Sequence, residues 1–327
     1  MFAKNKSLII KTLGYLILGI LVFVLVKAVD FHELKHHISK AKIEVLLFLI
    51  ALQVVTQLLI CVQWHTITKS VLGGSNFMKV MHLFTKGTVV EAITPGAKIG
   101  GEVTRLYYLK KDFECNTDKA LSIIVIQKSV SMSVLFSICA VSFIHICTKI
   151  EYSLGIQIVV TLINILLISF MIGLLFFSKS LNLFLEKFQN KIIIKINKFI
   201  KSYVEATSKL TKKEWIIEFL LSAVIWILYP LKMWILSVSF GIKLPFLVIL
   251  TVTMTAYFFS MFPITPGGLG TFEGAMIGIL SIMDVNTTLA ITVSVVFRFV
   301  TFWFVIIASG VFVAIYEFIL KRRSKSA

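Results

Sequence analysis

Long apolar runs, separated by short polar segments rich in lysine, make up most of the chain. A helix that crosses a bilayer needs about 20 consecutive apolar residues. Runs long enough for this fall near 8–28, 44–66, 120–147, 153–177, 215–240 and 288–318. Two further apolar segments, near 77–97 and 245–283, are each interrupted by Pro-Gly. The pattern predicts an all-α integral membrane protein with about six full spans and two broken segments.

The composition agrees with a membrane protein. The chain is 58% hydrophobic with a mean hydropathy of +0.94, above the roughly 45–50% apolar content of soluble domains. Its net charge of +17 comes from lysines between the apolar runs, so we expect contact with anionic lipid headgroups and not with nucleic acid. The four cysteines show no paired motif, which argues against a disulfide framework or a zinc ribbon. The run at 8–28 is too long for a signal-peptide core and is expected to be a retained helix.

The distribution of lysine predicts an orientation. Lysines cluster at both termini, in 98–119 and in 178–213, and the positive-inside tendency puts all four regions, both termini included, on the cytoplasmic side of the cell membrane. Six full crossings satisfy this arrangement. Segment 77–97 must then enter and leave from the cytoplasmic side and 245–283 from the outer side. Both are therefore expected to be re-entrant helical hairpins that oppose each other.

The two hairpins divide the chain into two repeats of opposite topology. Each repeat is a crossing, a hairpin and a crossing, over about 44–147 and about 215–318. A spanning helix and the basic amphipathic segment 178–213 link them. Inverted repeats with broken helices are a recurring plan of secondary transporters. We expect residues 1–327 to form a single polytopic membrane domain.

A short motif occurs once in each hairpin. It reads ITPGAKIGGE at 93–102 and ITPGGLGTFE at 264–273, and 171 residues separate both the two prolines and the two glutamates. Glycines permit positive φ and close backbone approach, and a helix that begins after such a loop offers free N–H groups to a phosphate. Alternatively, each Pro-Gly is a simple turn between helices, and each glycine is a place of close helix packing.

The candidate lipid- or phosphate-binding site combines both loops with charged residues in or beside apolar runs. Charges at membrane depth are functional hypotheses, and arginine suits bidentate contact with phosphate. The candidate residues are Thr94, Pro95, Gly96, Gly100, Gly101, Glu102, Arg105, Lys128, Pro266, Gly267, Gly268, Gly270, Glu273 and Arg298. A structural ion pair, for example between Glu273 and Arg298, is the alternative. We expect no catalytic residue, metal or cofactor.

The segment 178–213 holds nine lysines and two acidic residues. Its apolar residues form one stripe at helical spacing: Phe184, Phe188, Ile192, Ile196, Phe199 and Tyr203. This predicts an amphipathic helix that lies on the inner leaflet, with lysines reaching the headgroups. The stripe packing against the protein is the alternative.

The loop sequences resemble a known family. TPGAKIGGEVTRLYYLKK at 94–111, PGGLGTFEGAMIGIL at 266–280 and an arginine in the final span are similar to the flippase-like family, also called the lysylphosphatidylglycerol synthase transmembrane region. The resemblance covers roughly 8–318. It implies a polytopic membrane bundle that moves a lipid between leaflets. In well-known members a cytoplasmic domain follows, which transfers lysine from lysyl-tRNA to phosphatidylglycerol.

Two departures from the family pattern limit what the resemblance implies. The chain ends at Ala327, soon after its last span, so we expect no transferase domain and no aminoacyl-tRNA chemistry. Many members carry Glu-Arg followed by Asp where this chain has Gln127-Lys128 and then Ser131. The charged cluster of the family is thus reduced to one lysine.

A competing motif lies at 32–36, where the chain reads His-Glu-Leu-Lys-His. On a helix the two histidines of such a motif can hold zinc while the glutamate acts as base. A membrane zinc metalloprotease is therefore an alternative function. The motif falls in a short polar connector between spans, however, and no third ligand motif follows it.

These observations favour translocation of a phosphate-bearing lipid, such as an aminoacylated phospholipid or a polyprenyl-linked precursor. The expected partners are membrane phospholipids or polyprenyl-phosphate lipids. The alternative is a lipid-modifying enzyme of the phosphatidylglycerol lysyltransferase type, or its membrane subunit. The sequence leaves open a separately encoded partner enzyme and a homo-oligomer.

Overall fold

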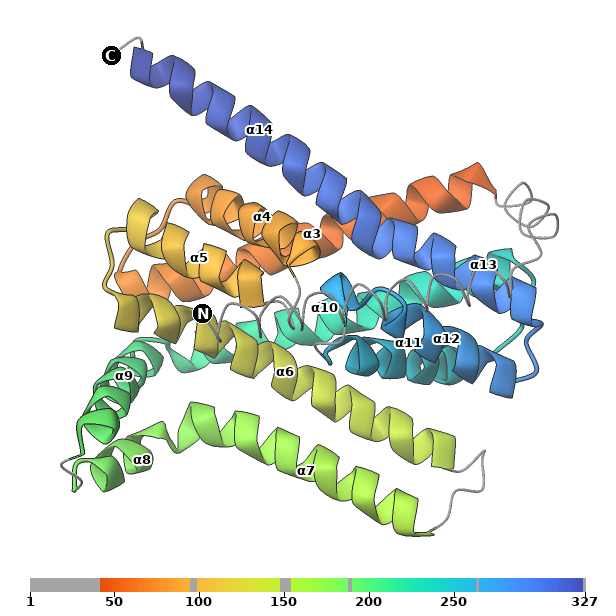
Figure 1. Ribbon diagram of the computed structural model, residues 1–327, viewed down its shortest axis with the longest axis horizontal. Coiled ribbons are helices and arrows are strands. Elements are labelled where there is room, and N and C mark those ends of the chain that lie inside the picture. Colours follow the sequence, from red (N-terminus) through yellow and green to blue (C-terminus); the bar gives the residue numbers. More distant parts are fainter. Residues whose placement is uncertain (1–41, 95–98, 148–153, 188–189, 263–264, 326–327) are drawn as a thin grey trace, which may run out of the picture. The chain divides into compact units, whose positions relative to one another are not determined.

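A computed structural model describes residues 42–94, 99–147, 154–187, 190–262 and 265–325 of the protein (Figure 1). Within these residues every regular element is helical, which confirms the predicted all-α class. The expected span at 8–28, the motif at 32–36, and Pro95 and Gly96 lie outside the described residues.

The elements are helices of very different lengths. The long ones are α3 (Ile43–Leu72), α6 (Thr117–Cys147), α7 (Leu154–Phe176), α10 (Lys212–Ser239) and α14 (Phe304–Lys325). The shorter ones are α4 (Phe77–Ile93), α5 (Ile99–Asp112), α8 (Ser178–Leu185), α9 (Lys191–Ser208), α11 (Phe246–Ser260), α12 (Thr271–Ile282) and α13 (Thr287–Arg298). A 3-10 turn, η1 (Pro266–Gly268), precedes α12, and a π-helical turn, η2 (Phe299–Trp303), joins α13 to α14.

Four described helical stretches are long and apolar enough to cross a membrane. They are Ile43–Leu72, Thr117–Ile144, Lys212–Ser239 and Thr287–Arg322. The α7–α8 pair is a fifth candidate, bent by 74° at its junction. α11 and α12 are apolar but too short to span, as expected for the arms of a broken segment. The chain is therefore an integral membrane protein with four or five described spans.

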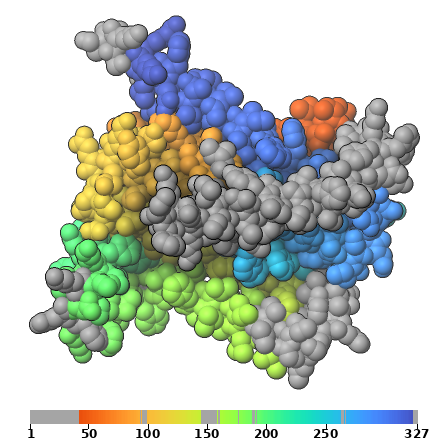
Figure 2. Space-filling view, viewed as in Figure 1, coloured from red at the N-terminus to blue at the C-terminus, as the bar shows by residue number. Residues whose placement is uncertain are grey.

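The basic segment 178–213 differs from the single amphipathic helix predicted for it. It contains two helices, α8 and α9, and the Asn190 side chain caps the second by accepting a hydrogen bond from the Ile192 N–H at 2.9 Å. The stripe divides as well, since Ile192 and Ile196 are exposed while Tyr203 is buried. Lipid contact and packing against the protein thus each describe one part of the stripe. The surfaces of α7, α8 and α9 adjoin in Figure 2, in light to darker green.

The described chain divides into two compact units. Unit 1 contains the chain up to Val55, Lys86–Glu102 and the chain from Leu228 onward, and unit 2 contains Thr56–Thr85 and Val103–Ile227. The core of unit 1 joins the start of α3, the end of α10, and α11, α12 and α13. The core of unit 2 joins the end of α3 with α4, α5, α6 and α9. Each unit thus combines segments from both halves of the sequence, because α3 and α10 run through both.

Candidate functional site

The second glycine-rich loop of unit 1 is shaped by positive φ angles. Gly267, Gly268 and Gly270 have φ of 61°, 68° and 80°, a region that residues with a Cβ rarely adopt. Space is restricted too, because a Cβ on Gly267 would lie 2.5 Å from the Phe302 ring and one on Gly268 would lie 2.8 Å from Ser260 Cβ. These glycines are therefore required by the backbone of the turn that leads into α12.

The sequence candidates Glu273 and Arg298 meet at this loop. The Nε of Arg298 donates to Glu273 Oε1 at 3.0 Å, and both side chains are largely buried. The other carboxyl oxygen, Oε2, accepts the Gly270 N–H at 2.6 Å, at the N-terminus of α12. Arg298 Nη2 donates to the main-chain oxygen of Gly267. One carboxylate thus joins the start of α12 to Arg298, and the ion pair considered from the sequence is present.

Two aromatic rings enclose the guanidinium of Arg298. Its Cζ lies 4.7 Å from the centroid of Phe272 and 4.2 Å from that of Phe302, within the range of cation–π attraction. Phe302 belongs to η2, a type of turn that is frequent at functional sites. Sequence reasoning missed this turn, because no Pro or Gly marks it.

The guanidinium keeps one hydrogen-bond donor group that the loop does not use. Nε and Nη2 are engaged as above, and no described residue accepts a hydrogen bond from Nη1. Arginine has five N–H donors in a planar fork, so a guanidinium anchored on one side can still bind an oxyanion on the other. The chemistry of this arrangement suits a phosphate or a carboxylate.

The first loop uses its glycines differently. A Cβ on Gly101 would lie 2.8 Å from both Glu91 Cβ and the Gly87 oxygen, and one on Gly100 would collide with Thr94. Neither glycine has positive φ. Close packing of α4 on α5, the alternative given above, therefore explains Gly100 and Gly101. Glu102, in the first turn of α5, belongs to the same unit.

The remaining candidates, Arg105 and Lys128, lie in unit 2. Arg105 is buried, and its Cζ lies 5.7 Å from the ring of Trp64 and 5.3 Å from that of Phe84. This stacking fixes the direction of the side chain on the inner side of α5. Lys128 is half-buried on α6, next to the fully engaged amide group of Gln127.

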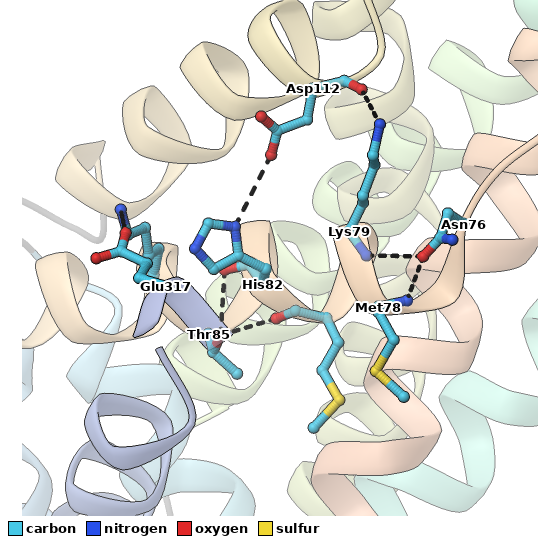
Figure 3. Close-up of polar contacts among 9 residues, drawn as sticks. Asn76, Met78, Lys79, His82, Thr85, Asp112 and Glu317 are labelled. Carbon is cyan, nitrogen blue, oxygen red and sulfur yellow. Dashed lines mark hydrogen bonds and ion pairs between the residues drawn. The ribbon is translucent and has the colours of Figure 1, made fainter. Parts of the chain in front are cut away.

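Polar contacts at the outer ends of α4 and α5 hold these two helices together (Figure 3). His82 Nδ1 lies 3.8 Å from Asp112 Oδ2, and Lys79 Nζ donates to the Asp112 main-chain oxygen at 3.1 Å. Further along α4, Lys86 forms an ion pair with Glu317 of α14 within unit 1. The arms of this helical pair are thus fastened by side chains on both sides of α4.

Sequence reasoning missed two buried polar clusters. In unit 1, Lys232 is fully buried and donates to Gln53 Oε1, with its Nζ 4.3 Å from the centroid of the Tyr229 ring. In unit 2, a second cluster contains Gln63, Gln127, Glu218 and Ser222. Each of these is one polar residue among apolar ones, and that isolation is the signal that was available in the sequence.

Comparison with known proteins gives one family over most of the chain. The family model described as "Lysylphosphatidylglycerol synthase TM region" matches residues 11–309. A UPF0104 membrane protein of Pyrococcus horikoshii is 24% identical over 293 residues, or 84% of this chain and 88% of the relative. A UPF0104 membrane protein of Methanothermobacter thermautotrophicus is 21% identical over 318 residues, or 92% and 93%. These matches confirm the resemblance drawn from the loop motifs.

Proposed function

The chain belongs to the lysylphosphatidylglycerol synthase transmembrane-region family, and we propose that it moves a phosphate-bearing lipid between the two leaflets of the cell membrane. The lipid is an aminoacylated phospholipid or a polyprenyl-linked precursor. Its headgroup binds at the glycine-rich loops while its acyl chains stay in the bilayer. In this proposal the other candidate residues of both loops, with Arg105 and Lys128, line the path of the headgroup.

The observation that carries the proposal is the anchored guanidinium of Arg298. It lies at an interrupted helix, where non-helical backbone is tolerated at membrane depth only against protein or a watery cavity. The carboxylate of Glu273 and the Gly267 oxygen fix its position, and its Nη1 remains for a headgroup oxygen. A preoriented arginine of this kind suits recognition of phosphate.

The order and spacing of the helices support an internal repeat. In the first half, α3, α4, α5 and α6 begin at residues 43, 77, 99 and 117, and in the second half α10, α11, α12 and α13 begin at 212, 246, 271 and 287. The corresponding starts are therefore 169, 169, 172 and 170 residues apart, close to the 171 residues between the two loop motifs. By the same spacing, Glu102 is the counterpart of Glu273 and Lys128 that of Arg298.

Contacts between α3 and α10 support opposite orientations of the two repeats. In unit 2, Gln63 of α3 donates to Ser222 of α10, and in unit 1, Lys232 of α10 donates to Gln53 of α3. Residue 232 is 169 after 63, and residue 222 is 169 after 53. The two contacts thus exchange under the interval that relates the two helices, as a two-fold relation requires. Inverted repeats have an axis of this kind in the membrane plane.

In the proposed orientation both termini and the α8–α9 segment lie on the cytoplasmic side. The exposed Ile192 and Ile196 would rest in the inner leaflet, with the flanking lysines at anionic headgroups. The two broken segments would enter from opposite faces, and alternating exposure of their loops would carry the headgroup across.

The test uses purified protein in liposomes that contain a phospholipid with a fluorescent headgroup. A membrane-impermeant quencher reports the fraction of label in the outer leaflet over time. The wild type and the Gly274→Ala variant, whose added Cβ meets no atom within 4 Å, should move lipid equally fast, while Arg298→Gln should be slower by at least about tenfold, the factor that corresponds to 1.4 kcal/mol. Movement no faster than in protein-free liposomes, for phosphatidylglycerol, its lysyl ester and a polyprenyl phosphate alike, would refute the proposal.

A second candidate is a lipid-modifying enzyme or its membrane subunit, because the matching family is described by the name of a synthase. Lipid extracts of cells with and without the gene separate the two functions. Loss of a lipid species would favour the enzyme. An unchanged lipid inventory with an altered distribution between leaflets would favour translocation.

A further inference from the structure

A cluster of polar side chains joins α3, α6 and α10 inside unit 2. Gln127 Nε2 donates to Gln63 Oε1 at 3.0 Å. Gln63 Nε2 in turn donates to Ser222 Oγ at 2.6 Å and to the main-chain oxygen of Glu218 at 3.3 Å. All four side chains are buried. They lie six to eleven residues inside the ends of their helices, or about 10–16 Å at 1.5 Å per residue.

The carboxyl group of Glu218 is the exception in this cluster. Glu218 is 0% exposed, and no described donor bonds to either of its carboxyl oxygens. Gln127 Oε1 is also buried without a described donor. The Gln63 amide lies beside the carboxyl group, but its hydrogen bonds go elsewhere. Reversing either glutamine amide alone would bring two like groups together, so the cluster is short of hydrogen-bond donors.

The charges around Glu218 do not compensate for this shortage. No described cation forms an ion pair with it, and the charge that acts on it is that of Glu214, one turn away on α10. Glu214 is itself bonded to Ser70 Oγ at 2.6 Å and to the Thr211 N–H at 2.7 Å. The other titratable side chains on these helices near this level are Cys61, His65 and Lys69 of α3 and Lys128 of α6.

A proton is the ligand that best completes the cluster. A buried carboxylate without donors or a cation is strongly disfavoured, whereas the acid form is neutral and supplies one O–H donor. Hard metal cations take about six or more oxygen ligands. Besides the carboxyl group, this cluster has only one side-chain amide oxygen, that of Gln127, without a described donor.

We propose that Glu218 is a proton-binding site that links protonation to the arrangement of α3, α6 and α10. With the cluster closed, the carboxylate binds one proton and becomes a carboxylic acid. Loss of the proton creates an anion that needs donors, so the cluster must open to water or rearrange its amides. Two protonation states thus correspond to two arrangements of three helices. The proposal goes beyond lipid movement, and proton binding does not depend on it.

The direct test is infrared spectroscopy of the purified protein. A protonated carboxylic acid has a carbonyl band apart from that of a carboxylate, and the band shifts in heavy water. The wild type should show this band at neutral pH, Glu218→Gln should lack it, and the matched control Glu214→Gln on the same helix should keep it. An identical band in the wild type and in Glu218→Gln would overturn the proposal. So would loss of the band on addition of sodium at constant pH, since the ligand would then be a metal ion.

Thermal melting tests the link to the helix arrangement. If the folded protein holds a proton that the unfolded chain releases, stability falls as the pH rises. The melting temperature of the wild type and of Glu214→Gln should therefore fall from mildly acidic to mildly alkaline pH more than that of Glu218→Gln, whose amide supplies donors at every pH. A pH dependence unchanged by Glu218→Gln would refute the link, and the infrared result shows separately whether the variant removed a bound proton.

Discussion

Removing one partner of the Arg298–Glu273 pair should destabilise the protein more than removing both. Arg298→Gln leaves Glu273 as a buried anion whose remaining described donor is the Gly270 N–H. Breaking a buried ion pair from one side costs about 3–5 kcal/mol. The two side chains are 8% and 11% exposed, so solvent screening reduces this cost little.

Glu273→Gln should cost less than Arg298→Gln. The guanidinium that it leaves behind still has the Gly267 oxygen and the faces of Phe272 and Phe302, and cation–π contacts contribute about 0.5–2 kcal/mol each. We therefore expect Glu273→Gln to cost about 1–2 kcal/mol less than Arg298→Gln. The double variant has no buried charge at this point, and exchange of a whole buried pair for neutral groups is often close to neutral in free energy.

The assay is thermal melting of the four proteins in one detergent, combined with the amount of phospholipid that copurifies with each. The expected order of melting temperature is the wild type and the double variant highest, then Glu273→Gln, then Arg298→Gln. Both variants that lack Arg298 should also retain less anionic lipid. Additive effects of the two single changes would refute the pairing argument, and unchanged lipid retention in both variants without Arg298 would remove this residue from the proposed binding site.

The other predictions concern the second loop, the orientation and the basic segment. Gly267→Leu should abolish lipid movement but not membrane insertion, because its φ and the ring of Phe302 exclude a side chain; lipid movement at the wild-type rate would mean that the loop is only a turn. A cysteine at position 190 should react with thiol reagents only from the cytoplasmic side, and reaction from outside would refute the orientation. Ile196→Asp should weaken binding of isolated α8–α9 peptides to anionic vesicles, measured by sedimentation, more than Tyr203→Phe, because residue 196 is exposed and residue 203 is buried; equal binding of the two peptides would contradict the assignment of this stripe to lipid.

Much of the fold follows from apolar run lengths and Pro-Gly positions. The run at 215–240 became α10 (Lys212–Ser239), and the interruption at Pro266 separates α11 from α12. The Glu273–Arg298 contact was also within reach of the sequence, because two opposite charges inside apolar runs each need a partner. Those predictions depend on local pattern or on the cost of unpaired charge, which are both visible in one dimension.

Other features depend on tertiary packing and escaped the sequence. Gly101 and Gly267 look alike in the repeated motif, but one faces a neighbouring helix and the other has a positive φ. Glu218 stands near the start of α10 beside other polar residues, where an end-of-helix charge in water is the ordinary expectation. Its full burial depends on how α3 and α6 pack against it, and composition or period says nothing about that packing.

The π-helical turn at Phe299–Trp303 makes the contact around Arg298 sensitive to chain length as well as to residue type. A turn of this kind holds one more residue than a turn of α-helix. Deleting one residue from it would let the backbone continue as a regular helix and would rotate everything that follows by about 100°, since an α-helix has 3.6 residues per turn. Phe302 would then leave the guanidinium although every contacting side chain were kept. In comparisons with more distant relatives, a single-residue gap between α13 and α14 therefore matters as much as a substitution of Arg298 itself.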